Sequence, residues 1–149
     1  DCCLPNEEYG SVTVTLKGVR FEITTFRSER EYINNRRPGE IQYIDELYPD
    51  ILRRDFIINT ICMDKDGQII DYLGGQEDLK NRIIRTVGDS KERFREDSLR
   101  MLRAIRFATI LDFELSNEVY NVLLRATSYD RNERYNTIRE FHNEFNKVK

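Results

Sequence analysis

The sequence is poor in the residues on which several common chemistries depend. Among 149 residues there is no tryptophan, one histidine (His142), three cysteines and three prolines. The cysteines Cys2, Cys3 and Cys62 form no C-x-x-C pair and are odd in number, so we expect neither a disulfide framework nor a structural zinc site. Mechanisms built on Ser–His, Cys–His or several histidines would all rest on His142. Any chemistry in this chain must therefore use carboxylates and arginines.

Long hydrophobic runs are missing as well. The mean hydropathy is -0.66, and no apolar stretch is long enough to span a bilayer. No charged and then apolar segment near residue 1 resembles a signal peptide, so we expect no membrane partner and a cytoplasmic location. Hydrophobic residues nevertheless make up 39% of the chain, with eight Tyr and eight Phe, which is enough for a folded core.

Basic side chains are concentrated in one segment of the chain. The formal net charge of -3 does not by itself point to a nucleic-acid binder. Residues 80–106, however, carry nine basic and four acidic side chains, whereas residues 1–79 carry nine basic and sixteen acidic ones. One basic segment therefore lies within an otherwise acidic chain.

The first part of the chain has the patterns of β structure. Alternating apolar residues predict strands over 11–17 and 19–26, and shorter strands are predicted over 41–44, 59–63, 68–71 and 83–87. A short helix is predicted over 45–54, with Pro49 in an early turn. Asp64 and Asp66 form the only D-x-D, but they lie in D-K-D-G, which indicates a hairpin turn rather than a metal site.

From residue 89 onward the pattern is helical. Asp89 or Ser90 can cap a first turn, and one helix is expected to run over 94–111 with an apolar stripe of Leu99, Leu102 and Ile105 against the core. Helices are also predicted over 116–126 and 135–148. No Pro/Gly linker separates the two parts, so we expect direct packing.

The most informative segment is 93–107, which reads R-F-R-E-D-S-L-R-M-L-R-A-I-R-F. Five of its residues are arginines that have only Glu96 and Asp97 as local acidic partners. Arginines without such partners suit phosphates or base edges, although a surface ladder of ion pairs fits the spacing equally well. On a helix, Asp97 and Arg100 would lie three apart and point to the same side.

An Asp/Arg pair at this spacing can select bases. Cytosine and adenine each present an amino donor beside an unprotonated ring nitrogen, which match a carboxylate and a guanidinium respectively. Uracil and guanine present a carbonyl beside a ring N–H. The carbonyl would then face the carboxylate and the N–H would face the guanidinium, so neither could form a hydrogen bond. The pair therefore favours C and A over U and G.

Three other features carry weaker signals. Arg53 and Arg54 could meet phosphate while Asp55 and Asn59 bind a ribose hydroxyl, although residues 53–59 also fit an ordinary helix end. The paired glycines in 71–79 favour a structural turn or hinge over a phosphate loop. Glu22, alone between apolar residues, is either solvated or one member of a metal-binding set completed elsewhere.

Taken together, these segments resemble the class II bacterial tRNA nucleotidyltransferase and poly(A) polymerase family, which includes the CCA-adding enzymes. The resemblance is carried by residues 23–27, 36–38, 53–59, 74–79, 84–88 and 93–107. It implies an α+β fold, with a polymerase-β-like nucleotidyltransferase head containing a mixed sheet over residues 1–87 and an all-helical neck over 88–149.

The resemblance also implies roles for particular residues. Nucleotide-binding roles are implied for Arg54, Asp55, Asp97, Arg100, Arg103 and Arg106, with Asp97 and Arg100 as the template that reads C and A, and Glu22 as a catalytic carboxylate. The implied substrates are ATP, CTP and the tRNA 3′ end, with Mg²⁺ as cofactor. A poly(A) polymerase, an A-adding enzyme and a non-catalytic RNA-binding module remain alternatives.

One departure concerns the family's first motif, a Gly-Gly…Arg-Asp turn followed by a D-x-D strand. It should precede Ser11, and ten residues cannot contain it. We therefore expect this chain to hold an interior portion of a family member, with the main Mg²⁺ ligands elsewhere. We expect the chain alone to bind nucleotide weakly and to be inactive.

Overall fold

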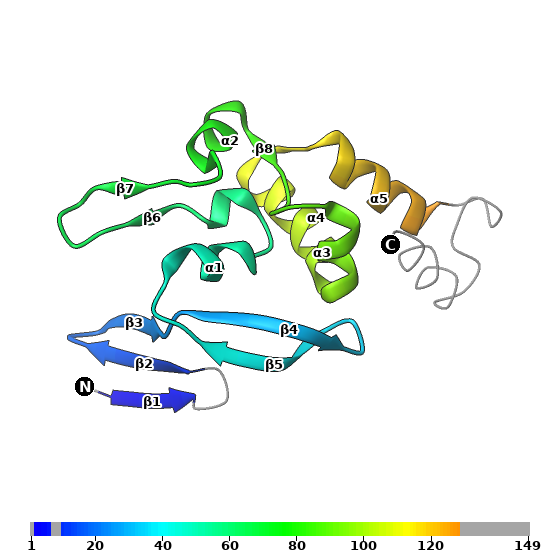
Figure 1. The fold of residues 1–149 in the computed structure, drawn as a ribbon. Helices are drawn as coiled ribbons and strands as arrows, with labels where there is room; N and C mark the ends of the chain where they lie inside the picture. The colour runs from blue at the N-terminus through cyan, green and yellow to red at the C-terminus, as the bar shows by residue number, and fades with distance from the viewer. Residues whose placement is uncertain (1, 7–9, 129–149) are drawn as a thin grey trace.

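The structure is a computed structural model that describes residues 2–6 and 10–128. The predicted helix over 135–148 and His142 lie outside the described residues. Within them, strands dominate the first third of the chain and helices the last third, so the α+β class is confirmed (Figure 1).

The predicted alternating strands form an antiparallel sheet. Strand β2 (Ser11–Leu16) pairs with both β1 (Cys2–Asn6) and β3 (Val19–Thr24). Val14 lies opposite Phe21, so the apolar residues of β2 and β3 share one face. Lys17 and Gly18 both have positive φ, of 50° and 80°, and form the predicted turn.

A second hairpin extends further than the sequence indicated. Strands β4 (Arg27–Ile33) and β5 (Arg37–Tyr43) pair antiparallel, where the pattern predicted only a short strand over 41–44. Strand β4 begins just after β3. Between the two strands the backbone stops pairing with the β1–β2–β3 sheet and begins to pair with the residues around β5. The Thr25 backbone N–H donates to Gly10 at 3.0 Å, whereas the next carbonyl, of Phe26, accepts from Ile44 at 2.9 Å.

The remaining strands are short. Strands β6 (Cys62–Met63) and β7 (Ile69–Ile70) pair antiparallel around the predicted turn, in which Asp64 Oδ1 accepts from the backbone of Asp66 and Gln68. Strands β8 (Ile83–Ile84) and β9 (Glu114–Leu115) form the parallel pair. The described strands therefore form four small sheets in place of one mixed sheet.

The helices begin close to where the sequence places them. They are α1 (Leu47–Leu52), the 3-10 helix η2 (Ile57–Asn59), α2 (Gly75–Asn81), α3 (Ser90–Glu96), α4 (Leu99–Leu111) and α5 (Asn117–Thr127). Asp89 caps α3 by accepting from Glu92 N at 3.0 Å, and Ser116 caps α5 by accepting from Val119 N, as predicted. Gly74 and Gly75 form a turn into α2, with the Gly74 φ at 79°.

The prediction of one helix over 94–111 is wrong. Asp97 ends α3 with extended backbone angles (φ -141°, ψ 107°), and α4 starts two residues later. The break changes which face of α4 is buried. Ala104 is fully buried, whereas Leu102 is 65% exposed, and Leu99 and Ile105 are exposed too. The predicted apolar stripe therefore does not face the core.

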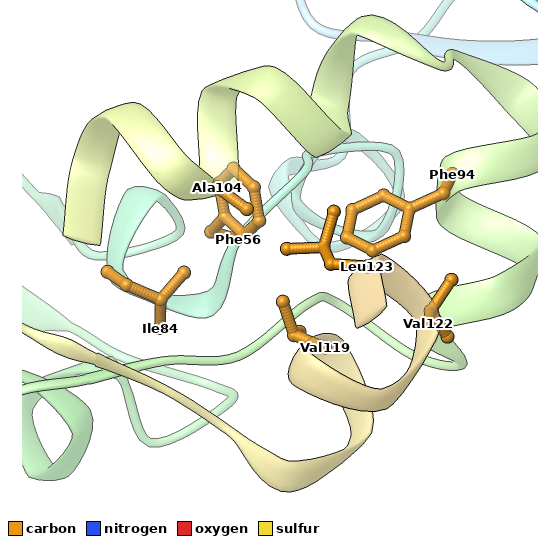
Figure 2. Packing of buried hydrophobic residues seen from close by; sticks show 7 residues of the cluster. All are labelled: Phe56, Ile84, Phe94, Ala104, Val119, Val122 and Leu123. Carbon is orange, nitrogen blue, oxygen red and sulfur yellow. The ribbon is translucent and has the colours of Figure 1, made fainter. Parts of the chain in front are cut away.

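The core joins the two parts of the chain. Figure 2 shows Phe56 and Ile84, from the first part, packed with residues of the helical part: Phe94, Ala104, Val119, Val122 and Leu123. The Phe56 and Phe107 rings meet edge to face, with 5.7 Å between their centres. This shared core confirms direct packing and fixes α4 against the segment that follows α1.

Candidate functional site

One open cavity of about 720 Å³ lies where the β4–β5 hairpin, the segment after α1, and the α3–α4 break come together. Its lining is mostly charged and contains seven arginines and four carboxylates, namely Arg27, Arg36, Arg37, Arg53, Arg54, Arg100, Arg103, Glu22, Glu29, Asp55 and Asp97. Tyr32, Pro38, Asn59 and Phe107 complete it. A cluster of guanidinium groups of this kind is typical of sites for phosphate-bearing ligands.

The structure brings six of the seven predicted site residues to this cavity. These six are Glu22, Arg54, Asp55, Asp97, Arg100 and Arg103. Arg106 is exposed and is not among the lining residues. The functional roles of all seven residues stay predictions.

Asp55 is held firmly at the floor of the cavity. It is 8% exposed, and its Oδ1 accepts from the backbone N–H of Phe56 at 2.9 Å and from Asn59 Nδ2 at 3.0 Å. Its Oδ2 accepts from Arg103 Nε at 2.6 Å. The Arg103 guanidinium also lies over the Phe107 ring, 5.2 Å from its centre. Residues 53–59 and helix α4 are therefore joined by an ion pair.

Asp50 organises the arginines of the same segment. It is 2% exposed, and its carboxylate accepts from Arg53 Nη2 at 2.6 Å and Arg54 Nη2 at 3.0 Å, and from the Arg27 backbone N–H at 3.2 Å. Burial alone raises the pKa of Asp50, but the hydrogen bonds from Arg53 and Arg54 outweigh it and hold the pKa below its usual range. The sequence analysis did not select Asp50, although its spacing of three and four residues from Arg53 and Arg54 in the predicted helix over 45–54 is typical of ion pairs. Only its contact with Arg27 is remote in sequence.

Asp97 and Arg100 both line the cavity, but their surroundings differ. Asp97 is half-buried, and its Oδ1 accepts from the Leu99 backbone N–H at 2.9 Å, which begins α4. Arg100 is 7% exposed, and Tyr32, Glu96 and two backbone carbonyls accept from its guanidinium.

The sequence predicts that most arginines of residues 93–107 lack a local acidic partner. Arg93 and Arg100 share Glu96, one of the two expected local carboxylates, whereas Arg103 pairs with the distant Asp55. Arg93 Nη1 also donates to the Leu52 carbonyl at 3.0 Å. Asp55 and Leu52 are remote in sequence, so spacing along one helix could not reveal them.

Glu22 is the one predicted metal-type residue at the cavity. It is exposed on β3 opposite Thr13. Among residues 10–128 no group of three or more His, Cys, Asp and Glu side chains could hold a metal ion. The described residues therefore do not by themselves form a metal site, and the catalytic role of Glu22 stays a prediction. In the described part of the chain no helix is long and apolar enough to cross a membrane.

The fold and cavity define an α+β protein with an arginine-rich site suited to a phosphate-bearing ligand. Residues 2–85 match the family described as "Poly A polymerase head domain". The chain therefore belongs to this family.

Curated relatives and solved structures agree with this assignment. The chain is 52% identical over 110 residues to the CCA-adding enzyme of Bacillus licheniformis and 44% identical over 117 residues to that of Staphylococcus aureus (strain MRSA252). These matches cover 74% and 78% of this chain but only 28% and 29% of the relatives.

Two solved structures extend the comparison. The crystal structure of the Bacillus stearothermophilus CCA-adding enzyme in complex with CTP matches 83% of this chain and 29% of that one, with a TM-score of 0.70 and 40% identity. A tRNA nucleotidyltransferase complexed with a primer tRNA and an incoming ATP analog matches with a TM-score of 0.65 and 29% identity, over 98% of this chain and 44% of that one. The chain thus spans less than half the length of these proteins.

Proposed function

We propose that the protein containing this chain is a tRNA nucleotidyltransferase that adds C and A to the tRNA 3′ end from CTP and ATP. The proposal rests on one observation: Asp97 and Arg100 both line the arginine-rich cavity. Relatives named as CCA-adding enzymes, and a similar structure solved with CTP, support it.

In this proposal different cavity residues contact the base, the ribose and the phosphates of the nucleotide. Asp97 accepts from the exocyclic amino group of C or A, and Arg100 donates to the neighbouring ring nitrogen through Nε, because both of its Nη groups already donate to protein acceptors. Arg54 and Arg103 face the triphosphate, while Asp55 orients Arg103 and accepts from the ribose. Mg²⁺, held by Glu22 together with carboxylates outside the described residues, would stabilise the attacking and leaving oxygens.

The test uses the protein expressed from the complete coding sequence and a tRNA that lacks its 3′ CCA. With CTP and ATP supplied separately and together, we expect C addition with CTP and full CCA with both. Asp97→Ala and Arg100→Ala should each weaken CTP and ATP binding by about ten- to a hundredfold, since a bidentate base contact is worth about 1–3 kcal/mol. Unchanged binding in both variants would refute the base-reading roles.

A poly(A) polymerase is the second candidate, because the matching family carries that description. The same assay separates the two functions by their products. Addition of A residues alone, without use of CTP, would favour a poly(A) polymerase or an A-adding enzyme. Nucleotide binding without any transfer would favour a non-catalytic RNA-binding module.

A further inference from the structure

The Tyr32 hydroxyl lies between a carboxylate and the proposed base-reading arginine. It donates to Glu29 Oε2 at 2.6 Å and accepts from Arg100 Nη2 at 3.2 Å. A tyrosine has one hydroxyl proton, so donation to Glu29 leaves its oxygen lone pairs free for Arg100. A tyrosine hydroxyl is protonated at neutral pH, and burial, together with the hydrogen bond to Glu29, raises the pKa of Tyr32 further. The hydrogen bonds therefore run in one direction, from Arg100 to Tyr32 to Glu29.

An unusual backbone conformation allows this arrangement. Glu29 and Tyr32 are three residues apart in β4, and a regular strand would place them on opposite faces. Glu31, between them, has a φ of 53°, in the left-handed region that non-glycine residues rarely adopt. The pairing of β4 with β5 passes from Arg30–Glu40 to Tyr32–Pro38 and skips Glu31. A Cβ added at Gly39 would lie 2.6 Å from the Glu31 carbonyl oxygen. The hairpin thus adopts a costly conformation that places Tyr32 beside Arg100.

The partners of Arg100 show what Tyr32 contributes. Nη1 donates to Glu96 Oε2 at 2.5 Å and to the Arg93 carbonyl at 3.2 Å, both on α3. Nη2 donates to the Arg53 carbonyl at 3.2 Å and to Tyr32, whose ring the guanidinium also covers at 5.6 Å from its centre. Glu96 and the Arg93 carbonyl therefore hold Nη1, whereas Tyr32 and the Arg53 carbonyl hold Nη2, and the Tyr32 ring also packs against the guanidinium plane.

We propose that Tyr32 is a positioning residue for base selection, holding the Arg100 guanidinium in the orientation that reads the incoming base. The inference rests on the proposed function, because it assigns to Arg100 the base contact described there. Tyr32 itself acts only through Arg100. A purely structural role would instead predict lost stability with unchanged base preference.

The test replaces Tyr32 by Phe in the full-length protein, which keeps the ring and removes the oxygen. Single-nucleotide addition to a tRNA lacking CCA is measured with CTP and with UTP. We expect the ratio of kcat/KM for CTP to that for UTP to fall about five- to twentyfold, because a hydrogen bond to a charged group is lost. The loss should lie mainly in KM for CTP. Tyr120→Phe, at an exposed tyrosine on α5, is the matched control and should leave the ratio unchanged. An unchanged ratio in Tyr32→Phe, or an equal fall in the control, would overturn the proposal.

A double-mutant cycle tests whether Tyr32 acts through Arg100. In an Arg100→Ala background, Tyr32→Phe should cause no further loss of selectivity, and a fully additive loss would contradict the proposal. If the unmodified protein adds no C, or if Arg100→Ala keeps the CTP preference, the proposed function fails and the role of Tyr32 fails with it. If addition depends on Arg100 and Tyr32→Phe is silent, only the role of Tyr32 fails.

Discussion

At the scale of single residues, two carboxylates near the cavity, the buried Asp50 and the half-buried Glu96, each accept from two arginines. Asp50 accepts from Arg53 and Arg54, and Glu96 accepts from Arg93 and Arg100. A shared carboxylate fixes two guanidinium groups relative to each other. Removing one such carboxylate leaves two cations close together without their common partner, which costs more than the loss of one surface ion pair.

We predict that Asp50→Asn destabilises the protein by about 3–5 kcal/mol at neutral pH, because it breaks a buried ion pair. The pKa of Asp50 is lowered in the folded state, so its stabilisation is fully present above the unfolded value of about 3.9 and is lost as the pH falls through the folded value. The difference between the wild type and the variant should therefore shrink below about pH 4. Urea unfolding at several pH values measures it, and a constant difference down to strongly acidic pH would contradict this account.

At the scale of elements, the β4–β5 hairpin and the α3–α4 break shape the cavity. The hairpin supplies Glu29 and Tyr32, and the break supplies Asp97. Each depends on a backbone conformation that departs from the regular element, at Glu31 in the strand and at Asp97 between the helices. Departures of this kind persist only where surrounding contacts hold them, and here Arg100 donates hydrogen bonds to both elements, to the Tyr32 hydroxyl on β4 and to the Arg93 carbonyl on α3.

Gly39→Ala should disturb the hairpin at this point. Its Cβ would lie 2.6 Å from the backbone oxygen of Glu31, which cannot move without shifting the strand. We expect a loss of about 1–3 kcal/mol in the free energy of unfolding, the usual cost of overpacking. Urea unfolding measures the loss, with Gln42→Ala, exposed on the same strand, as the control. Equal stabilities of the two variants would show that Glu31 and Gly39 are not in tight contact.

At the scale of the whole molecule, the distribution of charge matters more than its sum. The chain carries a formal net charge of -3, yet its cavity is lined by seven arginines and four carboxylates. Bulk charge therefore misleads about the ligand, because most acidic side chains lie away from this cavity. An arginine-rich concave surface attracts phosphate even on an acidic protein.

We predict that CTP binding to the full-length protein weakens strongly as KCl rises from about 0.1 to about 1 M, because the Debye length falls from about 10 to about 3 Å. Cytidine, which has the same base and ribose without phosphate, should bind more weakly and with little dependence on salt. Calorimetric titration of both ligands provides the comparison. Equal salt dependence for CTP and cytidine would mean that the arginines do not contact the phosphates.

Alternation in the sequence predicted β2 and β3, and the capping residues Asp89 and Ser116 predicted the starts of α3 and α5, because these features depend on neighbouring residues alone. The family resemblance implied the head-and-neck organisation and indicated six of the residues that line the cavity. The start of α4, its buried face and the acceptors of Arg100 became known from the three-dimensional structure. Two of those acceptors, the Arg53 carbonyl and the Tyr32 hydroxyl, lie 47 and 68 residues away in sequence. Contacts over such separations are set by packing, and no local pattern records them.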